Sequence, residues 1–149
     1  MQNITYSPPS SVVKLSRTAA NLPATTQTAY FTVAGGKVLV LGIYGEVTTV
    51  IQTQACNLKI VSNPTVGADV DMCAVLNITA HAVGTFYNIT GTVADALVAT
   101  TSGAAKSQAI PMIVAAGTID LSTSATNTGA TKWTIHYIAL DPGATIVTA

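Results

Sequence analysis

This chain contains very few charged residues. Aspartate, glutamate, lysine and arginine together make up 8% of its 149 residues, and six basic residues cancel six acidic ones. An average soluble domain carries about 25% charged residues, and a mixed surface charge opposes association. Threonine, with 24 copies, fills part of the gap. This composition predicts a chain that packs against copies of itself or against a partner. The alternative is a soluble monomer with a threonine-coated surface.

Clustered basic residues and long apolar segments are both missing. Only Lys14 and Arg17 lie close together, whereas binding to nucleic acid phosphates needs grouped lysines and arginines. The longest apolar run, residues 38–44, stops at Glu46 and falls far short of the roughly 20 residues that span a bilayer. We therefore expect neither nucleic acid nor a membrane as a partner.

Groups that carry chemistry are also scarce. Cys56 and Cys73 are too few for a disulfide framework and fall in apolar strand patterns, which predicts buried free thiols. His81 and His136, the only histidines, are not spaced with these cysteines as zinc ligands would be. No G-x-S-x-G nucleophile motif or phosphate-binding loop is present. The sequence therefore predicts a protein that is not an enzyme and has no cofactor.

One pair of carboxylates leaves an alternative open. Asp69 and Asp71 fall on the same face of an expected strand start, where they could hold a calcium ion at a turn. A pair of solvated turn residues explains the same pattern.

The first 27 residues differ from the rest of the chain. They combine three prolines with serine, threonine, glutamine and asparagine, and they show no strand or helix periodicity. We expect an extended N-terminal arm over residues 1–27 and one β-domain over residues 28–149.

From Tyr30 onward, short runs of valine, isoleucine, threonine and tyrosine alternate with turn residues. Gly35-Gly36 predicts a tight hairpin, and residues 80–84 predict the connection of a second one. Residues 93–107 predict a long loop with one helical turn, and Asp141-Pro142-Gly143 predicts a turn.

Seven or eight such strands predict an all-β, two-sheet β-sandwich. In its last long strand, Trp133, Ile135 and Tyr137 should share one face, and Thr134, His136 and Ile138 the other. A jelly-roll-like and an immunoglobulin-like sandwich both fit, because periodicity reports the faces of strands and not their order.

The run at residues 38–44 is apolar at consecutive positions, so half of it cannot face the core. Gly42 and Gly45 would weaken a plain strand and indicate a β-bulge or a close backbone approach. We take the run, with the two neighbouring basic residues, as a candidate interface: Lys14, Arg17, Val38, Leu39, Val40, Leu41, Ile43 and Tyr44.

The phrases "LPATTQTAYFTVAGGKVLVLGIYGEVTTVIQTQACNLKIVSNPTVGADVDMCAVLNIT", "AVGTFYNITGT" and "AGTIDLSTSATNTGATKWTIHYIALDPGATI" cover most of the chain from Leu22 onward. In these phrases the chain resembles small proteins encoded near the head genes of tailed bacteriophages and prophages, thought to be capsid decoration or cement proteins. The first 21 residues have no counterpart in that resemblance.

The resemblance implies a jelly-roll-like sandwich on the outer surface of the virion capsid. Its partners would be the major capsid protein and further copies of itself, commonly as a homotrimer, and Lys14 and Arg17 would meet carboxylates on a neighbour. Assembly would take place in the host bacterial cytoplasm.

Three alternatives remain. A receptor- or glycan-binding module on the virion would favour aromatic loops, whereas loops 102–108 and 122–129 contain no aromatic residue. A pilus or surface-layer subunit would need an export signal, and residues 1–11 show no such pattern. A small hydrolase would need catalytic residues.

The tripeptide Asn-Ile-Thr occurs at Asn3, Asn77 and Asn88 and matches the N-glycosylation rule. Because a protein assembled in a bacterial cytoplasm does not ordinarily meet the glycosylating enzymes, we expect these asparagines to be bare. Ile78 and Ile89 should then be inward residues at the ends of strands.

Overall fold

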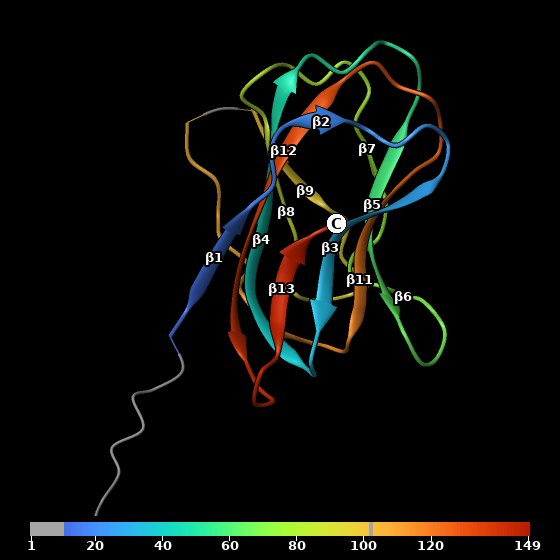
Figure 1. The fold of residues 1–149 in the computed structure, drawn as a ribbon. Helices are drawn as coiled ribbons and strands as arrows, with labels where there is room; N and C mark the ends of the chain where they lie inside the picture. Colours follow the sequence, from blue (N-terminus) through green and yellow to red (C-terminus); the bar gives the residue numbers. More distant parts are fainter. Residues whose placement is uncertain (1–10, 102) are drawn as a thin grey trace, which may run out of the picture.

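The computed structural model describes residues 11–101 and 103–149, and all of its regular structure is β-strand. The strands form two antiparallel sheets packed face to face, as Figure 1 shows, so the predicted two-sheet β-sandwich is confirmed. No helix occurs in these residues, so the helical turn expected within residues 93–107 is wrong for the part that the structure describes. None of the described segments could cross a bilayer as a helix.

Sheet A has seven strands, in the order β1-β12-β4-β8-β9, with β2 also pairing with β12 and β10 with β4. Its strands are β1 (Val13–Ser16), β2 (Ala20–Asn21), β4 (Val38–Thr49), β8 (Phe86–Asn88), β9 (Val98–Thr100), β10 (Met112–Val114) and β12 (Ala130–Ala139).

Sheet B has six strands, in the order β13-β3-β11-β5-β6, with β7 also pairing with β5. Its strands are β3 (Gln27–Ala34), β5 (Asn57–Pro64), β6 (Val70–Asp71), β7 (Leu76–Asn77), β11 (Gly117–Thr123) and β13 (Thr145–Thr148). The total exceeds the seven or eight strands expected because several strands are only two to four residues long, too short to leave a periodic pattern.

The chain changes sheets at the connections from β3 to β4, β4 to β5, β11 to β12 and β12 to β13. The hairpin expected at Gly35-Gly36 is therefore wrong. Both glycines have the positive φ that tight hairpin turns use, but they carry the chain from sheet B to sheet A. A Cβ on Gly35 would lie 2.5 Å from the carbonyl oxygen of Gly143, so this crossing packs tightly against the Asp141–Gly143 turn.

The second expected hairpin, around residues 80–84, is also wrong, because β7 pairs with β5 in sheet B whereas β8 pairs with β4 in sheet A. By contrast β5 and β6 do pair with each other, across a turn over residues 65–69. Ile78 and Ile89 are fully buried at strand ends, as expected.

The core fills the space between the sheets. On β12 the predicted alternation is confirmed: Trp133, Ile135 and Tyr137 are buried in the core, and Thr134, His136 and Ile138 lie on the outer face of sheet A. Of the outer three, Thr134 is nevertheless only 4% exposed, and its hydroxyl lies 2.9 Å from Ser16 Oγ of β1. Cys56 and Cys73 are buried free thiols, also as predicted.

The described part of the expected arm, residues 11–27, is extended, and two stretches of it join sheet A. β1 pairs with β12 from Val13 to Ser16, and β2 pairs with β12 at Ala20 and Asn21. Figure 1 shows this segment running along one edge of the sandwich. Residues 1–10, which include Asn3, lie outside the described residues.

Candidate docking surface

Strand β4 decides which of the candidate interface residues reach the surface. Val38, Val40 and Ile43 are at most 2% exposed and pack in the core, so they cannot meet a partner in this fold. Leu39 and Leu41 are half-buried and Tyr44 is exposed, all on the outer face of sheet A.

A β-bulge at Leu41 produces this division. Tyr137 of β12 lies opposite Val40, but the next residue back along β12, His136, lies opposite Gly42, so Leu41 is the extra residue. A bulge shifts the inward and outward alternation by one position. It therefore turns Ile43 inward and Tyr44 outward, and it fits the bulge that the glycine at 42 indicated.

Gly45 allows a close approach to the backbone of β4, which was the other role that the sequence indicated for these glycines. A Cβ on this residue would lie 2.6 Å from the indole ring of Trp133, so only glycine leaves room for the ring on the inner side of β4.

Neighbouring strands extend the apolar surface around Leu39. Ile113 of β10 and Ile138 of β12 are the residues opposite Leu39 on its two sides, and Ile113 is 68% exposed. Val12, just before β1, is exposed on the same side. We call this surface the sheet A face, defined by its outward apolar residues Val12, Leu39, Leu41, Tyr44, Ile113 and Ile138.

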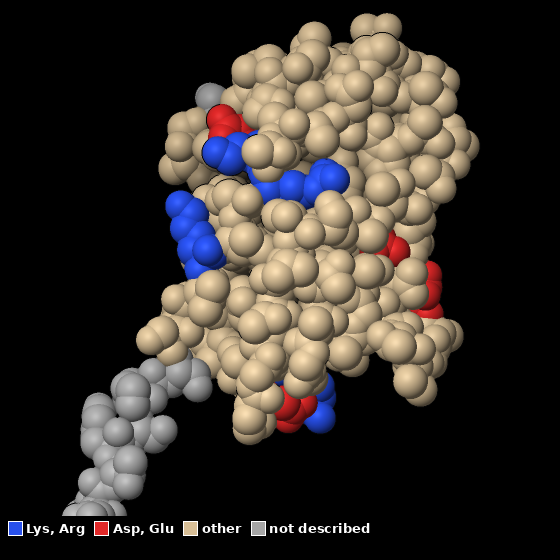
Figure 2. Space-filling view, viewed as in Figure 1, with Lys and Arg blue, Asp and Glu red and all other residues tan. Residues whose placement is uncertain are grey.

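The basic residues are distributed unequally over the molecule. Lys37 pairs with Asp141 at 3.6 Å, and Lys59 pairs with Asp71 at 2.7 Å. The other four, Lys14, Arg17, Lys106 and Lys132, form no salt bridge with any residue that the structure describes. In Figure 2 blue side chains gather over β1 and the neighbouring edge of sheet A, with one acidic group beside them.

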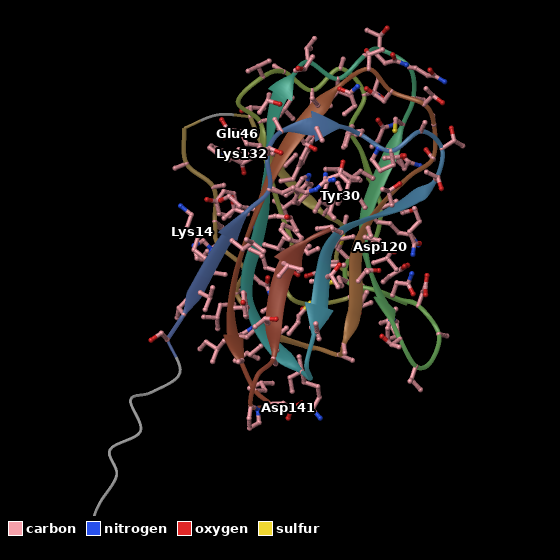
Figure 3. All side chains as sticks on the ribbon, in the orientation of Figure 1. Lys14, Tyr30, Glu46, Asp120, Lys132 and Asp141 are labelled. Carbon is pink, nitrogen blue, oxygen red and sulfur yellow. The ribbon has the colours of Figure 1, made fainter. Side chains whose placement is uncertain are left out.

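Three of these residues lie along the β1 edge of the sandwich, and we call them the basic strip: Lys14, Arg17 and Lys132. Lys14 lies opposite His136 in the β1–β12 pair, and Lys132 lies opposite Glu46 in the β12–β4 pair. Figure 3 shows Lys14 on β1, and Lys132 close to Glu46. The chain has no net charge, but along this edge three basic residues outnumber the neighbouring Glu46, so the edge is locally basic.

Arg17 is held more firmly than the two lysines. Its guanidinium carbon lies 4.1 Å from the centre of the Tyr30 ring, and Nη2 donates a long hydrogen bond of 3.5 Å to the carbonyl oxygen of Ala149. Burial raises the pKa of the Tyr30 hydroxyl, and the charge of Arg17 opposes that shift. Arg17 thus fastens β1 to sheet B while leaving charge at the surface.

A groove opens in the middle of the sheet A face. It has a volume of about 380 Å³ and is bounded by Tyr44, Phe86, His136 and residues 105–108. Tyr44 and His136 stack at 6.1 Å between ring centres. The loop over residues 102–108 contains no aromatic residue, but strands β4 and β8 place Tyr44 and Phe86 at the groove.

Two amide side chains at the groove are almost fully buried, Asn88 at 4% exposure and Gln108 at 8%. The amide nitrogen of Gln108 donates to the carbonyl oxygens of Val40 and Ile110. Neither Asn88 Oδ1 nor Gln108 Oε1 has a hydrogen-bond partner among the described residues.

The two histidines take part in aromatic contacts. His81 Nδ1 lies 2.7 Å from the Tyr87 hydroxyl, and burial lowers the pKa of His81. His136 stacks on Tyr44. No group of three or more histidine, cysteine, aspartate or glutamate residues suited to a metal ion occurs in residues 11–101 and 103–149.

The carboxylates of the calcium alternative are separated by their partners. Asp71 accepts both short hydrogen bonds of Lys59 Nζ, at 2.7 and 2.9 Å, whereas Asp69 accepts from Gln27. Asp69 and Asp71 therefore do not form the pair that the sequence suggested.

Comparison with known proteins adds no relative. No protein-family model, curated protein or solved structure matches this chain. The likeness to phage decoration proteins therefore remains a resemblance between sequence segments.

Sequence reasoning missed Ile113, Ile138 and Lys132 as members of this surface. Their membership depends on which strands lie beside β4 and β1, and one sequence contains no signal for strand neighbours. The alternation of β12 placed Ile138 on the outer face, but it could not put Leu39 beside it.

Proposed function

We propose that this chain is a non-enzymatic structural protein of a virion that binds the outside of a phage capsid and stabilises it. The observation that carries the proposal is the sheet A face with its basic strip: an outward sheet surface with large apolar side chains in contiguous positions, bordered by cations that no described acidic group pairs. The resemblance in sequence phrases and the low charge of the chain support the same function.

Apolar contact supplies the affinity in this proposal. Removing apolar surface from water contributes about 25 cal/mol per Å², and a standard interface buries about 800 Å² on each partner. Association offsets much of that gain in a single complex. Because a capsid repeats the same site many times, and a homotrimer would engage several sites at once, a modest contact per subunit becomes a large gain in shell stability.

Charge supplies orientation. Lys14, Arg17 and Lys132 favour a capsid surface that presents carboxylates, since complementary potentials fix the register and raise the association rate. Binding to capsids should therefore weaken as salt rises, because exposed charges are screened beyond about 8 Å at physiological ionic strength.

Two measurements test the proposal. Mass measurement of purified virions should find this chain in many copies per particle, and a few copies or none would refute it. Light scattering of the purified chain should find an oligomer, and a strict monomer at high concentration would remove the homotrimer from the proposal.

A variant pair tests the surface itself. Ile113→Asp places a charge at the most exposed position of the sheet A face, whereas Val83→Asp places one at a valine that is 60% exposed in the connection between β7 and β8. We expect Ile113→Asp to abolish capsid binding with an unchanged melting temperature, and Val83→Asp to bind as the unaltered chain does. Equal binding by the two variants would exclude the sheet A face as the docking surface.

The groove favours a second candidate function, a receptor- or glycan-binding module displayed on the virion. Its volume falls in the range of about 300 to 1,000 Å³ typical of small-ligand pockets, and aromatic walls with nearby amide groups suit a sugar ring. The two functions compete for one face, because a capsid covering the sheet A face would also cover the groove. Binding of host glycans by intact, decorated particles would favour the second function, and glycan binding by neither particles nor the free chain would exclude it.

A further inference from the structure

The outer face of sheet B contains the most deeply buried charged side chain among the described residues. Asp120 of β11 is 3% exposed, although its side chain points away from the core. Figure 3 shows it on β11 next to β5. An ionised carboxylate so removed from water is costly unless it is paired with a positive charge.

The partners of Asp120 are neutral. Its Oδ2 accepts from Gln27 Nε2 at 2.8 Å and from Asn63 Nδ2 at 3.2 Å. Its Oδ1 has no partner among the residues described. The register explains the two contacts, because Gln27 and Asn63 lie diagonally opposite Asp120 on the flanking strands β3 and β5.

A second carboxylate meets the same amide nitrogen. Gln27 Nε2 also lies 2.8 Å from Asp69 Oδ2. One neutral NH₂ group therefore donates to both carboxylates, and their Oδ2 atoms are at most twice 2.8 Å apart. The nearby lysine does not compensate them, since Lys59 Nζ is bonded to Asp71.

We propose that Asp69 and Asp120, with the amide side chains of Gln27 and Asn63, form a binding site for a calcium ion. The ion bridges the two Oδ2 atoms, and the Gln27 side chain, whose Nε2 lies between them, moves outward to make room for it. Calcium–oxygen distances are about 2.3 to 2.6 Å, so each carboxylate oxygen moves inward by only about 0.4 Å.

The amide groups complete the oxygen set. A half-turn of a terminal amide exchanges its nitrogen and oxygen, and this torsion is soft. Once the Gln27 side chain has moved outward and both amides have turned, Gln27 Oε1 and Asn63 Oδ1 face the ion as ligands, and water fills the remaining positions. Calcium fits this set better than magnesium, which demands near-ideal octahedral geometry at about 2.0 to 2.1 Å.

The site would fasten the β5–β6 turn to the centre of sheet B. Asp69 ends the turn over residues 65–69, whereas Asp120 lies on β11. A shared cation therefore adds a link to the Gln27 amide and to the hydrogen bond from Thr65 N to the carbonyl oxygen of Ala116. The proposal is independent of capsid binding, because the sheet A face lies on the other side of the sandwich.

Thermal unfolding of the full chain in CaCl₂, in MgCl₂ and in NaCl of equal ionic strength tests the site. A ligand at about 100 times its Kd, in a domain of this size, raises the melting temperature by roughly 5 to 10 °C. We expect this rise in CaCl₂ and a smaller one in MgCl₂. Terbium luminescence gives a direct reading of ion binding that does not depend on stability.

The variants are Asp69→Asn and Asp120→Asn, with Asp71→Asn as the matched control. Asp69 is exposed, so its variant should fold and lose the calcium-dependent rise and at least tenfold in terbium affinity even where Asp120→Asn fails to fold. Asp71→Asn should keep both responses. Equal rises in all three salts, no terbium binding at millimolar concentration, or an unchanged response in Asp69→Asn would each overturn the proposal.

Discussion

Adding one methyl group to Gly45 should destabilise the sandwich, whereas adding it to Gly42, three residues earlier on the same strand, should not. A Cβ on Gly45 would lie 2.6 Å from Trp133 Cε2 and 2.7 Å from Cζ2. A Cβ on Gly42 would meet no atom within 4 Å, and neither residue has a positive φ. The two variants therefore add the same group to one strand, and they differ in what it meets.

Trp133 cannot easily move to accommodate the methyl group. The indole is 1% exposed, its Nε1 donates to Thr131 Oγ1 at 2.9 Å, and its ring stacks on Tyr87 at 6.3 Å between centres. Overpacking of this kind costs about 1 to 3 kcal/mol. At about 2 to 4 °C per kcal/mol for a chain of this length, the melting temperature of Gly45→Ala should fall by roughly 2 to 12 °C.

The control variant, Gly42→Ala, should instead raise the free energy of unfolding. Where the backbone conformation allows it, Gly→Ala restricts the unfolded chain and stabilises a protein by about 0.4 to 1 kcal/mol. Urea denaturation followed by the fluorescence of Trp133, the only tryptophan, gives both free energies of unfolding. Equal stability of Gly42→Ala and Gly45→Ala would refute the close packing of Trp133 on the bare backbone of β4.

Two further predictions concern buried titratable groups. Burial lowers the pKa of His81 from its usual 6.5, so the folded protein binds this proton less tightly than the unfolded chain does. The stability that His81 contributes is complete above about pH 6.5 and is lost as the pH falls through that value towards the folded pKa. Urea titrations from about pH 5 to 8 should show a smaller loss in His81→Gln, and an identical pH dependence would contradict this account. Cys56 and Cys73 are each 1% exposed, and burial raises the pKa of the Cys73 thiol. A thiol reagent should therefore modify them only as fast as the chain opens, and immediate modification of the native protein would contradict their burial.

Strand existence could be predicted from this sequence, but strand neighbours could not. The alternation from Trp133 to Ile138 fixes which side chains share a face, and the structure confirms it. Gly35 and Gly36 predicted a hairpin and do have a positive φ, yet that conformation serves a crossing between sheets as well as a hairpin. What decides between them is the packing of Gly35 on the distant Asp141–Gly143 turn, which no local pattern contains.

The candidate surface was predictable in outline for a similar reason. Consecutive apolar residues showed that half of the run at 38–44 must face outward, and Gly42 indicated a bulge. Without that bulge the alternation that buries Val38 and Val40 would also bury Tyr44, and would expose Ile43. The position of the extra residue, Leu41, depends on the register with β12, so the sequence alone could not assign the two halves.

Asp120 was missed although it left a signal. An acidic residue between Ile119 and Leu121 falls on the outward face of an apolar strand. From the sequence alone, this pattern is typical of an ordinary solvated position. Its burial arises from Gln27, Asn63 and Asp69, which come from three other segments and close over it. Contacts between segments distant in the sequence are what a single sequence cannot supply.

The two outer faces of the sandwich have opposite chemical character, and this bears on how a capsid-bound subunit would be oriented. The sheet A face combines apolar side chains with unpaired cations, whereas the outer face of sheet B carries Asp69, Asp71 and Asp120 with a single lysine that Asp71 already binds. A partner rich in carboxylates would attract the first face and repel the second. A subunit docked through sheet A would therefore turn the Asp69–Asp120 cluster towards solvent, where calcium can reach it. Because the two surfaces do not overlap, removing either carboxylate of that cluster should alter calcium-dependent stability without changing capsid binding, and Ile113→Asp should do the reverse.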